Sequence, residues 1–280
     1  ASDSNSFLCS FINDYRFIDH DRFFKDVSGL CWDIRNSQPY MASVQNQVLN
    51  FMKKVKEPLQ DNPDFDFLRT ELLTYLKAEK HSISGMLKDL GKEGTELISP
   101  FSNLLTYSAS DSVFQILRSA ERSGKKFSVV LSEARPMKEG VKFAKRIAKM
   151  NIPVTLVVDM YLPHFIPTVE FVLIGADWIS ETQFTNKIGT GFLVDLAHKQ
   201  NIPVYIAAST DKILAQKYYP LNIDSQPQEE ILRTENDQLT VKNRYFEAVL
   251  LSGEMRFITE KGILELAEIV SIAGKTRIKD

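Results

Sequence analysis

Residues 171–190 read FVLIGADWISETQFTNKIGT. The apolar run Phe171–Ile174 predicts a buried strand, and a Gly-Ala pair then brings the carboxylate of Asp177 to the strand end. Asn186 and Lys187 follow, and Ile-Gly-Thr comes next at the predicted start of a helix. An acid, an amide and an ammonium group beside helix N-terminal amides suit acid–base chemistry on a small anionic ligand. The segment is equally typical of a strand-to-helix turn with a solvated Asp and Lys.

Outward from this segment, apolar strand-like runs alternate with amphipathic helical patterns. The predicted strands are Leu104–Thr106, Phe127–Leu131, Val154–Val158, Phe171–Ile174 and Val204–Ala207, and the predicted helices cover residues 113–120, 141–148 and 192–197. The sequence Asn-Ile-Pro-Val occurs at 151–154 and at 201–204, which indicates one helix-to-strand connection used twice. This alternation predicts βαβ units and an α/β domain with a mostly parallel, doubly wound, Rossmann-like sheet.

The chain is predicted to divide near Pro100, with a helical N-terminal domain over residues 1–100 and the Rossmann-like domain over residues 101–280. Helical periodicity before Pro100 predicts helices at about 38–56, 67–76 and 83–97, the last interrupted near Gly91. Residues 220–243 are polar and predict a surface excursion. The pattern at 263–270 predicts a closing helix.

Composition limits the class of protein. At 280 residues the chain is long enough for two domains, and 44% hydrophobic and 25% charged residues are ordinary for a globular protein. A formal net charge of −2 gives no basic field for nucleic acid or an anionic membrane, and neither a membrane span nor a signal peptide is expected. Two cysteines and four scattered histidines lack ligand spacing, so we expect no metal, no other cofactor and a cytoplasmic setting.

Polar side chains follow each of the five predicted strands, at the point where the strand ends. They are Tyr107, Ser108 and Ser110 after the first strand, Ser132, Glu133 and Arg135 after the second, Asp159 after the third, Asp177 after the fourth, and Ser209 and Thr210 after the fifth. Ligands of open parallel sheets bind beyond the carboxyl ends of the strands, so these side chains are predicted to line one site.

A phosphorylated sugar fits this set of groups. Its hydroxyls would bond to the polar side chains, and its phosphate would bind Arg135, Lys187 and the helix N-termini. Single members also have structural explanations, because Ser108 and Ser110 can cap the following helix. Glu133 and Arg135 can likewise form a surface ion pair of little energetic value.

Six sequence blocks occur in the order and approximate spacing of one superfamily. They are LLTYSASDSVFQIL, SEARPMKEGVKFAK, IPVTLVVD, VLIGADWIS, NKIGT and IPVYIAAS, over roughly Leu104 to Ala208. On these blocks the chain resembles the superfamily that contains the regulatory α, β and δ subunits of the exchange factor for translation initiation factor 2. The same superfamily contains methylthioribose-1-phosphate isomerase and ribose-1,5-bisphosphate isomerase.

The resemblance implies a helical domain followed by a Rossmann-like domain, a homodimer or larger assembly, and a translation factor as a possible partner. It also implies that the isomerase members convert an aldose 1-phosphate to a ketose 1-phosphate without a metal or nucleotide cofactor. They use a cysteine at the first strand exit and an aspartate at the fourth. Asp177 matches that aspartate, Asn186 and Lys187 match an Asn-Lys pair, and Arg135 matches the arginine of an acidic-x-Arg-Pro turn.

The cysteine is missing from this chain. Tyr107-Ser108 stands where the isomerases carry a His-Cys pair, and this hydroxyl-rich exit is more similar to the regulatory subunits. A thiol, with a pKa of about 8.5, can be tuned into a base, whereas a serine hydroxyl needs a neighbouring base to activate it. Asp177 is nevertheless retained, although some regulatory subunits have lost their equivalent.

Three functions follow from this reasoning. The first is a non-catalytic protein that binds a sugar phosphate or nucleotide, in which Arg135, Asn186 and Lys187 hold the anion and Asp177 and Ser108 contact the sugar.

The second is a phosphosugar isomerase with altered chemistry, in which Asp177 acts as acid and base and Glu133 or Asp159 takes the carbon-bound proton. The third is a dimeric interaction scaffold with a vestigial pocket.

Overall fold

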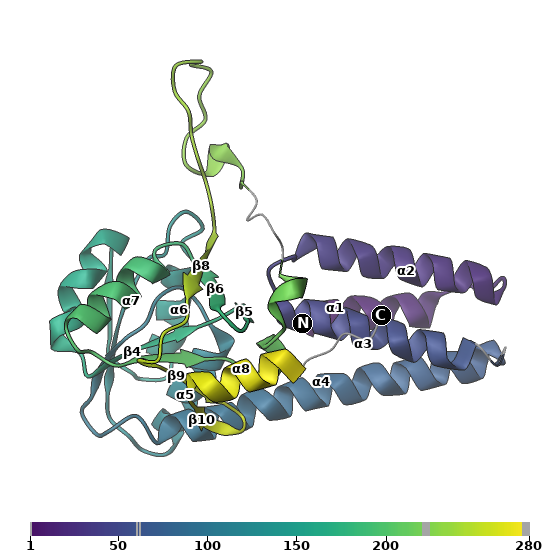
Figure 1. The fold of residues 1–280 in the computed structure, drawn as a ribbon, viewed down its shortest axis with the longest axis horizontal. Coiled ribbons are helices and arrows are strands. Elements are labelled where there is room, and N and C mark those ends of the chain that lie inside the picture. Colours follow the sequence, from purple (N-terminus) through teal and green to yellow (C-terminus); the bar gives the residue numbers. More distant parts are fainter. Residues whose placement is uncertain (1, 60, 62, 220–224, 276–280) are drawn as a thin grey trace. The chain divides into compact units, whose positions relative to one another are not determined.

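The chain forms two compact units, one ending at Met86 and the other beginning at Leu87, so the boundary lies inside helix α4 (Phe65–Thr95) (Figure 1). The computed structural model describes residues 2–59, 61, 63–219 and 225–275. Within these residues, no helix combines the length and the apolar character that crossing a bilayer requires.

The first unit is helical. It contains α1 (Ser2–Asp14), α2 (His20–Ser37), α3 (Ala42–Leu59) and the first part of α4. Asp19 caps α2, because its Oδ1 accepts the backbone N–H of Arg22 at 2.7 Å. Apolar side chains three and four residues apart on these helices form one buried core that includes Leu8, Phe23 and Leu72. The predicted helix at 38–56 is thus α3, displaced by a few residues.

Helix α4 corrects the prediction of separate helices at 67–76 and 83–97, and it is not interrupted near Gly91. It is continuous from Phe65 to Thr95. A Cβ added at Gly91 would lie 2.9 Å from the carbonyl oxygen of Gln115, and one added at Gly94 would lie 2.5 Å from Ile116 Cδ1. These glycines let α4 approach α5 (Asp111–Arg122) closely, so they serve packing and do not break the helix.

The second unit is an α/β structure built on a seven-stranded sheet among the described residues, in the order β10-β9-β7-β4-β1-β2-β3. The strands are β1 (Asn103–Leu105), β2 (Ser128–Ser132), β3 (Val154–Val157), β4 (Phe171–Gly175), β7 (Val204–Ala207), β9 (Met255–Thr259) and β10 (Gly262–Leu264). All neighbours pair in parallel except β10, which is antiparallel to β9. The prediction of a mostly parallel Rossmann-like sheet is confirmed, and all five predicted strands are present.

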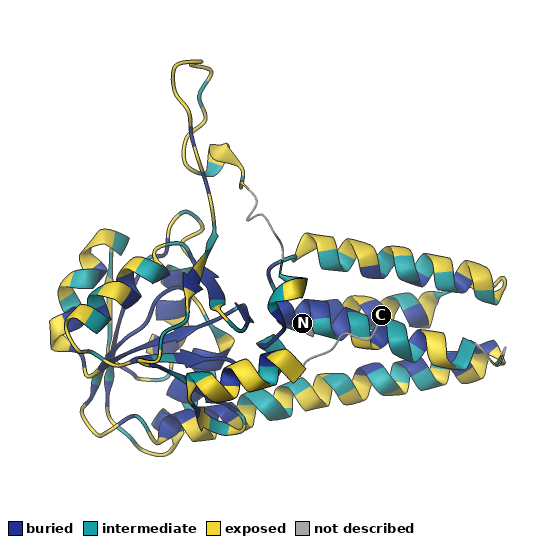
Figure 2. Ribbon diagram, viewed as in Figure 1, coloured by how far each residue is buried: buried dark blue, intermediate teal, exposed yellow. Residues whose placement is uncertain are grey.

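Helices cover both faces of this sheet, because successive strand residues point to opposite sides. Leu105 and Val172 belong to a core under α7 (Thr190–Lys199) and α8 (Leu266–Lys275). Their neighbours Leu104 and Leu173 belong to a second core under α5 and α6 (Glu139–Ala148). Figure 2 shows the central strands of the sheet as mostly buried and the outer faces of these helices as exposed.

The repeated Asn-Ile-Pro-Val sequence forms the same connection twice, as predicted. Asn151 and Asn201 follow α6 and α7 and adopt left-handed φ angles of 58° and 55°. Asparagine tolerates this conformation better than most residues, and the following Ile-Pro leads directly into β3 and β7.

The C-terminal part differs from the prediction. Ile263 and Leu264 lie in strand β10 and not in the predicted helix at 263–270, because a tight β9–β10 turn precedes α8. Gly262 supplies the φ of +114° that this turn requires. A second, antiparallel sheet of β5 (Trp178–Ile179), β6 (Gln183–Lys187) and β8 (Phe246–Leu250) was also not predicted.

The irregular segments complete the unit. Single-turn and longer 3₁₀ helices are η1 (Asp159–Thr168), η2 (Thr210–Lys212), η3 (Gln216–Tyr218) and η4 (Gln228–Glu230). Of the predicted surface excursion at 220–243, residues 220–224 lie outside the described residues. The described part extends away from the sheet as an arm (Figure 1).

Candidate functional site

The order of the strands reverses between β1 and β4, which is where sheets of this type bind ligands. Ser108 follows β1 and Asp177 follows β4, so the two side chains leave neighbouring strands at the same edge. The two exits approach closely, because a Cβ added at Gly175 would overlap the hydroxyl of Ser110. The ends of β1 and β4, after which the sequence predicts site residues, are therefore adjacent in space.

Ser108 and Lys187 meet at one carboxylate. Glu139 Oε1 accepts a hydrogen bond from Ser108 Oγ at 3.0 Å and lies 2.7 Å from Lys187 Nζ. Ser108 is 8% exposed and the Lys187 side chain 3% exposed. Ser108 also has a φ of 63°, which is uncommon for a residue other than glycine. A hydroxyl, a carboxylate and an ammonium group are thus held together beside the strand ends.

Glu139 is one residue that sequence reasoning missed. It is the first residue of α6, where an acid is ordinarily explained by the helix dipole, so only its contacts distinguish it. A Cβ added at the next residue, Gly140, would overlap the carbonyl oxygen of Ser132, so glycine lets the start of α6 lie against the end of β2. Among the described residues, Glu139 Oε2 and the hydroxyl of Ser132 are buried and have no hydrogen-bond partner.

Asp159 holds the turn that carries Arg135. Its two carboxylate oxygens accept the backbone N–H groups of Ala134 and Arg135, each at 2.8 Å. The peptide bond that follows Arg135 is cis, and the Arg135 side chain is exposed. Glu133 lies 3.8 Å from Lys138 Nζ. Asp159 therefore positions the turn, and both of its oxygens are already occupied.

Asp177 is partly buried. Burial raises the pKa of its carboxyl group above the ordinary value, and the positive charge of Lys212 opposes that rise. Lys212 Nζ donates to the carbonyl oxygen of Ala176 at 2.7 Å, which places its charge next to Asp177. A carboxyl group with a raised pKa keeps its proton to higher pH and can serve as an acid.

Three of the predicted residues make structural contacts. Tyr107 donates its hydroxyl to the carbonyl oxygen of Ile188 at 2.6 Å, and burial raises its pKa. Asn186 Nδ2 donates to Thr190 Oγ1 at 3.1 Å, at the start of α7. Ser110 caps α5 by accepting the backbone N–H of Val113 at 3.4 Å, in line with the structural explanation given for it above.

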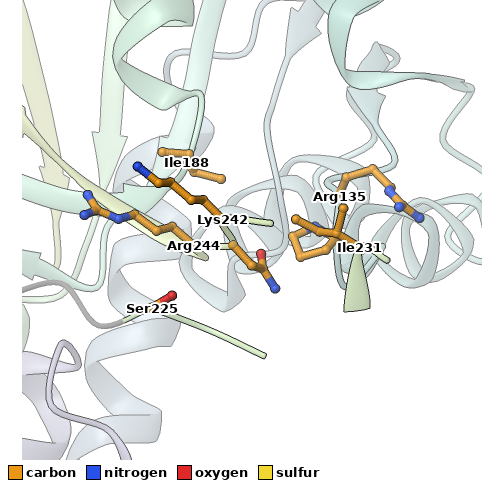
Figure 3. A pocket seen from close by; sticks show the side chains of 8 residues that line it. Arg135, Ile188, Ser225, Ile231, Lys242 and Arg244 are labelled. Atoms are coloured by element: carbon orange, nitrogen blue, oxygen red, sulfur yellow. The ribbon is translucent and has the colours of Figure 1, made fainter. Parts of the chain in front are cut away.

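A cavity of about 760 Å³ opens at Arg135 and at Ile188, the residue that follows Lys187. Its lining residues are Arg135, Pro136, Ile188, Ser225, Ile231, Lys242, Asn243 and Arg244. Figure 3 shows the charged ends of Lys242 and Arg244 on one side and that of Arg135 on the opposite side, with Ile188 and Ile231 nearer the middle. Lys242 comes from the arm and Arg244 directly follows it, and nothing in the sequence pattern associated them with the strand exits.

Apart from Tyr107, Ser110, Glu133 and Asn186, the predicted residues fall into three groups. Ser108 and Lys187 are joined through Glu139, Arg135 lies on the cavity and is held by Asp159, and Asp177 has a separate environment beside Lys212. Within the described parts of the chain, no three His, Cys, Asp or Glu side chains are grouped so that they could hold a metal ion.

Comparisons with known proteins identify the family. The initiation factor 2 subunit family matches residues 3–266. A putative translation initiation factor eIF-2B subunit 2-like protein of Pyrococcus furiosus is 30% identical over 181 residues, which are 64% of this chain and only 61% of that relative. A ribose 1,5-bisphosphate isomerase of Thermococcus kodakarensis is 26% identical over 253 residues, 87% of this chain and 78% of the relative.

A solved structure agrees at the level of the fold. The translation initiation factor eIF-2B of Pyrococcus horikoshii OT3 superimposes with a TM-score of 0.76 at 22% identity, over 94% of this chain and 89% of that chain. The family match extends over most of the sequence, and its members include both initiation-factor subunits and sugar-phosphate isomerases. The chain belongs to the initiation factor 2 subunit family.

Proposed function

We propose that this protein binds a phosphorylated sugar or a nucleotide at the carboxyl ends of its parallel strands, as a regulatory-subunit-like member of its family. The cavity carries the proposal, because the cations Arg135, Lys242 and Arg244 line it together with the hydroxyl-bearing Ser225. Cationic side chains with hydroxyl groups next to them suit a phosphate attached to a polyhydroxyl ligand. Ser108 stands at the first strand exit, where the isomerases of the family use a cysteine. We therefore propose that this protein binds its ligand without the cysteine-dependent isomerisation.

A thermal-shift panel tests this proposal. The panel contains pentose phosphates, methylthioribose 1-phosphate, ribose 1,5-bisphosphate, hexose phosphates and nucleoside monophosphates. A ligand at a hundred times its Kd stabilises the folded state by about 2.7 kcal/mol, which corresponds to a rise in Tm of about 5–10 °C for a unit of this size.

The variants Lys242→Ala and Arg244→Ala should reduce the shift, whereas Lys145→Ala, on the exposed face of α6, should leave it unchanged. The absence of a shift with every compound would refute the proposal and favour a dimeric interaction scaffold with a vestigial pocket.

A second candidate function is isomerisation of an aldose phosphate. Two observations favour it: burial raises the pKa of Asp177, and the hydroxyl of Ser108 donates to a carboxylate. In this candidate Asp177 donates a proton to the carbonyl oxygen of the ligand. Asp177→Asn should abolish turnover and spare binding, so an Asn variant with full turnover would rule out this role.

We also propose that the protein assembles as a homodimer or larger oligomer, as the resemblance to its family implies. A translation initiation factor as partner is proposed on the same ground. Light scattering tests the oligomeric state, and we expect a mass of at least twice 31.9 kDa. Binding of a purified initiation factor 2 to the immobilised full chain tests the proposed partner.

A further inference from the structure

The residues that line the cavity come from segments far apart in the sequence. Arg135 lies on the turn after β2, whereas Ile231 and Lys242 lie on the arm (Figure 3). Residues 225–243 contain the short 3₁₀ helix η4 and no strand, so no β-ladder fixes this part of the lining. Its position therefore depends largely on side-chain contacts.

Glu230 fastens the arm at the position next to Ile231. Its Oε2 accepts a hydrogen bond from Asn243 Nδ2 at 2.8 Å, and its Oε1 accepts the hydroxyl of Tyr245. Asn243 is 2% exposed, so this bond is shielded from solvent. The two donors lie on either side of Arg244 in the sequence. One carboxylate thus ties together the lining residues Ile231 and Arg244.

Tyr245 extends the connection to the other segments that line the cavity. Its hydroxyl lies 3.3 Å from the Sδ atom of Met137, the residue after Pro136. Its backbone carbonyl oxygen accepts the N–H of Ile188 at 2.8 Å, and its ring centroid lies 5.5 Å from Lys187 Nζ. Pro136 and Ile188 both line the cavity. Tyr245 is therefore in contact with the turn after β2, the end of β6 and the arm.

The hydroxyl of Tyr245 acts as a donor to Glu230. Burial and the hydrogen bond to Glu230 raise the pKa of Tyr245 to about 12, so the hydroxyl keeps its proton at neutral pH. It has one proton to donate, and a carboxylate is a much stronger acceptor than the thioether sulfur of Met137. A negative charge beside a cavity for an anionic ligand opposes binding. Attraction for the ligand therefore does not explain Glu230, whereas its two hydrogen bonds do.

We propose that Glu230 and Tyr245 are positioning residues of the cavity. They hold the segment that carries Lys242 and Arg244 beside the turn of Arg135. The inference rests on the proposed function and deepens it, because it identifies what keeps the cations of the cavity in place. Neither residue lines the cavity, so both act through residues that do. Affinity falls in proportion to the fraction of molecules in which the binding groups are in position.

Calorimetric titration of the full chain with ribose 5-phosphate, and with adenosine monophosphate as a second probe, is the test. Glu230→Gln replaces one acceptor oxygen by an amide donor and so breaks one of the two hydrogen bonds. We expect its Kd to rise about 10-fold or more, because an arm in position one-tenth of the time binds ten times more weakly. Electrostatics alone predicts the opposite sign, because the substitution removes an anion beside an anion site.

The neighbouring Glu229 is a matched control. It lies on the same 3₁₀ helix and is exposed, so Glu229→Gln removes the same charge without touching the contacts of Glu230. Its Kd should equal that of the wild type or lie slightly below it. A rise in Kd of equal size in both variants would mean that the hydrogen bonds of Glu230 have no special part in binding.

Tyr245→Phe tests the other partner of the same hydrogen bond. It removes the hydroxyl and keeps the ring beside Lys187, and we expect a similar rise in Kd. The double variant with Glu230→Gln should bind about as weakly as the weaker single variant, because both substitutions break one contact. Tyr161→Phe, at a tyrosine that is 49% exposed, is the control. Hydrogen exchange should become faster in residues 226–243 of both single variants and stay unchanged in β1, β2 and β4.

The failure of the positioning role is distinguishable from the failure of the proposed function. A Kd that is unchanged or lower in Glu230→Gln and in Tyr245→Phe overturns the positioning role and leaves the binding function intact. A wild-type chain that binds neither probe, and no other compound of the panel, overturns both. Weaker binding together with faster exchange throughout the sheet would mean that the two residues support the fold in general, and the positioning role would be wrong.

Discussion

The buried ammonium group of Lys187 depends on Glu139 for a charged partner. Its side chain is almost fully buried, and its ammonium group lies 2.7 Å from Glu139 Oε1. A buried cation that loses its partner keeps the cost of desolvation without the compensating attraction. The pair therefore links the start of α6 to the end of β6.

Lys187→Met tests this dependence. We expect the free energy of unfolding to fall by about 2–3 kcal/mol, less than for a fully buried pair because the Glu139 side chain is 28% exposed. Urea unfolding followed by circular dichroism measures it. The double variant Lys187→Met/Glu139→Gln should lose less than Lys187→Met alone, and Lys145→Met is the exposed control. A change within about 0.5 kcal/mol for Lys187→Met would contradict the pairing argument.

Asp177 should make stability depend on pH. Burial raises its pKa in the folded state, so above the ordinary Asp pKa of about 3.9 the folded chain binds more protons than the unfolded chain. Its contribution to stability is therefore present below that value and is lost as the pH rises through the folded pKa.

The variant Asp177→Asn should remove this loss of stability at higher pH. The Tm of the variant should exceed that of the wild type at pH 8, by about 2–4 °C for each kcal/mol gained, and the difference should shrink toward pH 4. Differential scanning calorimetry from pH 4.5 to pH 8 measures it. Asp195→Asn, on the exposed side of α7, is the control. A difference that grows toward acid pH would show that the assumed direction is wrong.

At the residue scale, the sequence located some site residues and overlooked others. Asp177 was predictable at a strand end because a buried apolar run precedes it directly. The contact of Ser108 with Glu139 was not, because it depends on how closely α6 lies against β2, which only the packing at Gly140 settles. Lys242 was hidden for a similar reason, since it lies in an irregular segment without periodicity.

At the scale of elements, two glycines of α4 distinguish the effect of helix propensity on stability from the effect of packing. Nothing lies within 4 Å of a Cβ added at Gly85, whereas one added at Gly94 would lie 2.5 Å from the fully buried Ile116. The same change to alanine therefore meets open space at one position and a packed side chain at the other.

Gly85→Ala and Gly94→Ala should have opposite effects. Gly85→Ala should stabilise by about 0.5–1 kcal/mol, because alanine is the better helix former. Gly94→Ala should destabilise by about 1–2 kcal/mol, because overpacking outweighs that gain. Urea unfolding of both variants provides the comparison. Equal stabilisation at the two positions would show that α4 and α5 separate easily.

The elements that were predicted well are those with continuous apolar runs. All residues of β4 are buried. A strand with such a continuous apolar run can be predicted from its own sequence, without knowledge of the strands that pair with it. Strand β8 is mostly exposed or half-buried, so its sequence lacks that signal and its pairing with β6 defines it. The start of α8 was misplaced because Ile263 and Leu264 fit the helical periodicity, while pairing with β9 draws them into a strand.

At the scale of the whole molecule, each unit has a core of its own. The helical unit buries a cluster that includes Leu72, and the α/β unit buries clusters on the two faces of its sheet, with Val172 in one of them. Units with separate cores can open separately.

Hydrogen exchange measured by mass spectrometry should resolve the two cores. Leu72→Ala should cost about 2–5 kcal/mol and speed exchange in α1, α2 and α3, with the strands of the sheet unaffected. Val172→Ala should produce the reverse pattern. Faster exchange throughout the chain in both variants would show that the two units unfold as one.

The indole of Trp178 follows Asp177 in the sequence and is 1% exposed, with its N–H donated to the carbonyl oxygen of Leu214 at 3.0 Å. The chain has one other tryptophan, Trp32, which is 64% exposed. Iodide in solution will quench the emission of Trp32 and leave that of Trp178, so the remaining light comes from a single fluorophore beside the candidate acid. The fluorescence of Trp178 can therefore report ligand binding at the strand ends of the native protein. A ligand titration then needs no dye, label or added mutation.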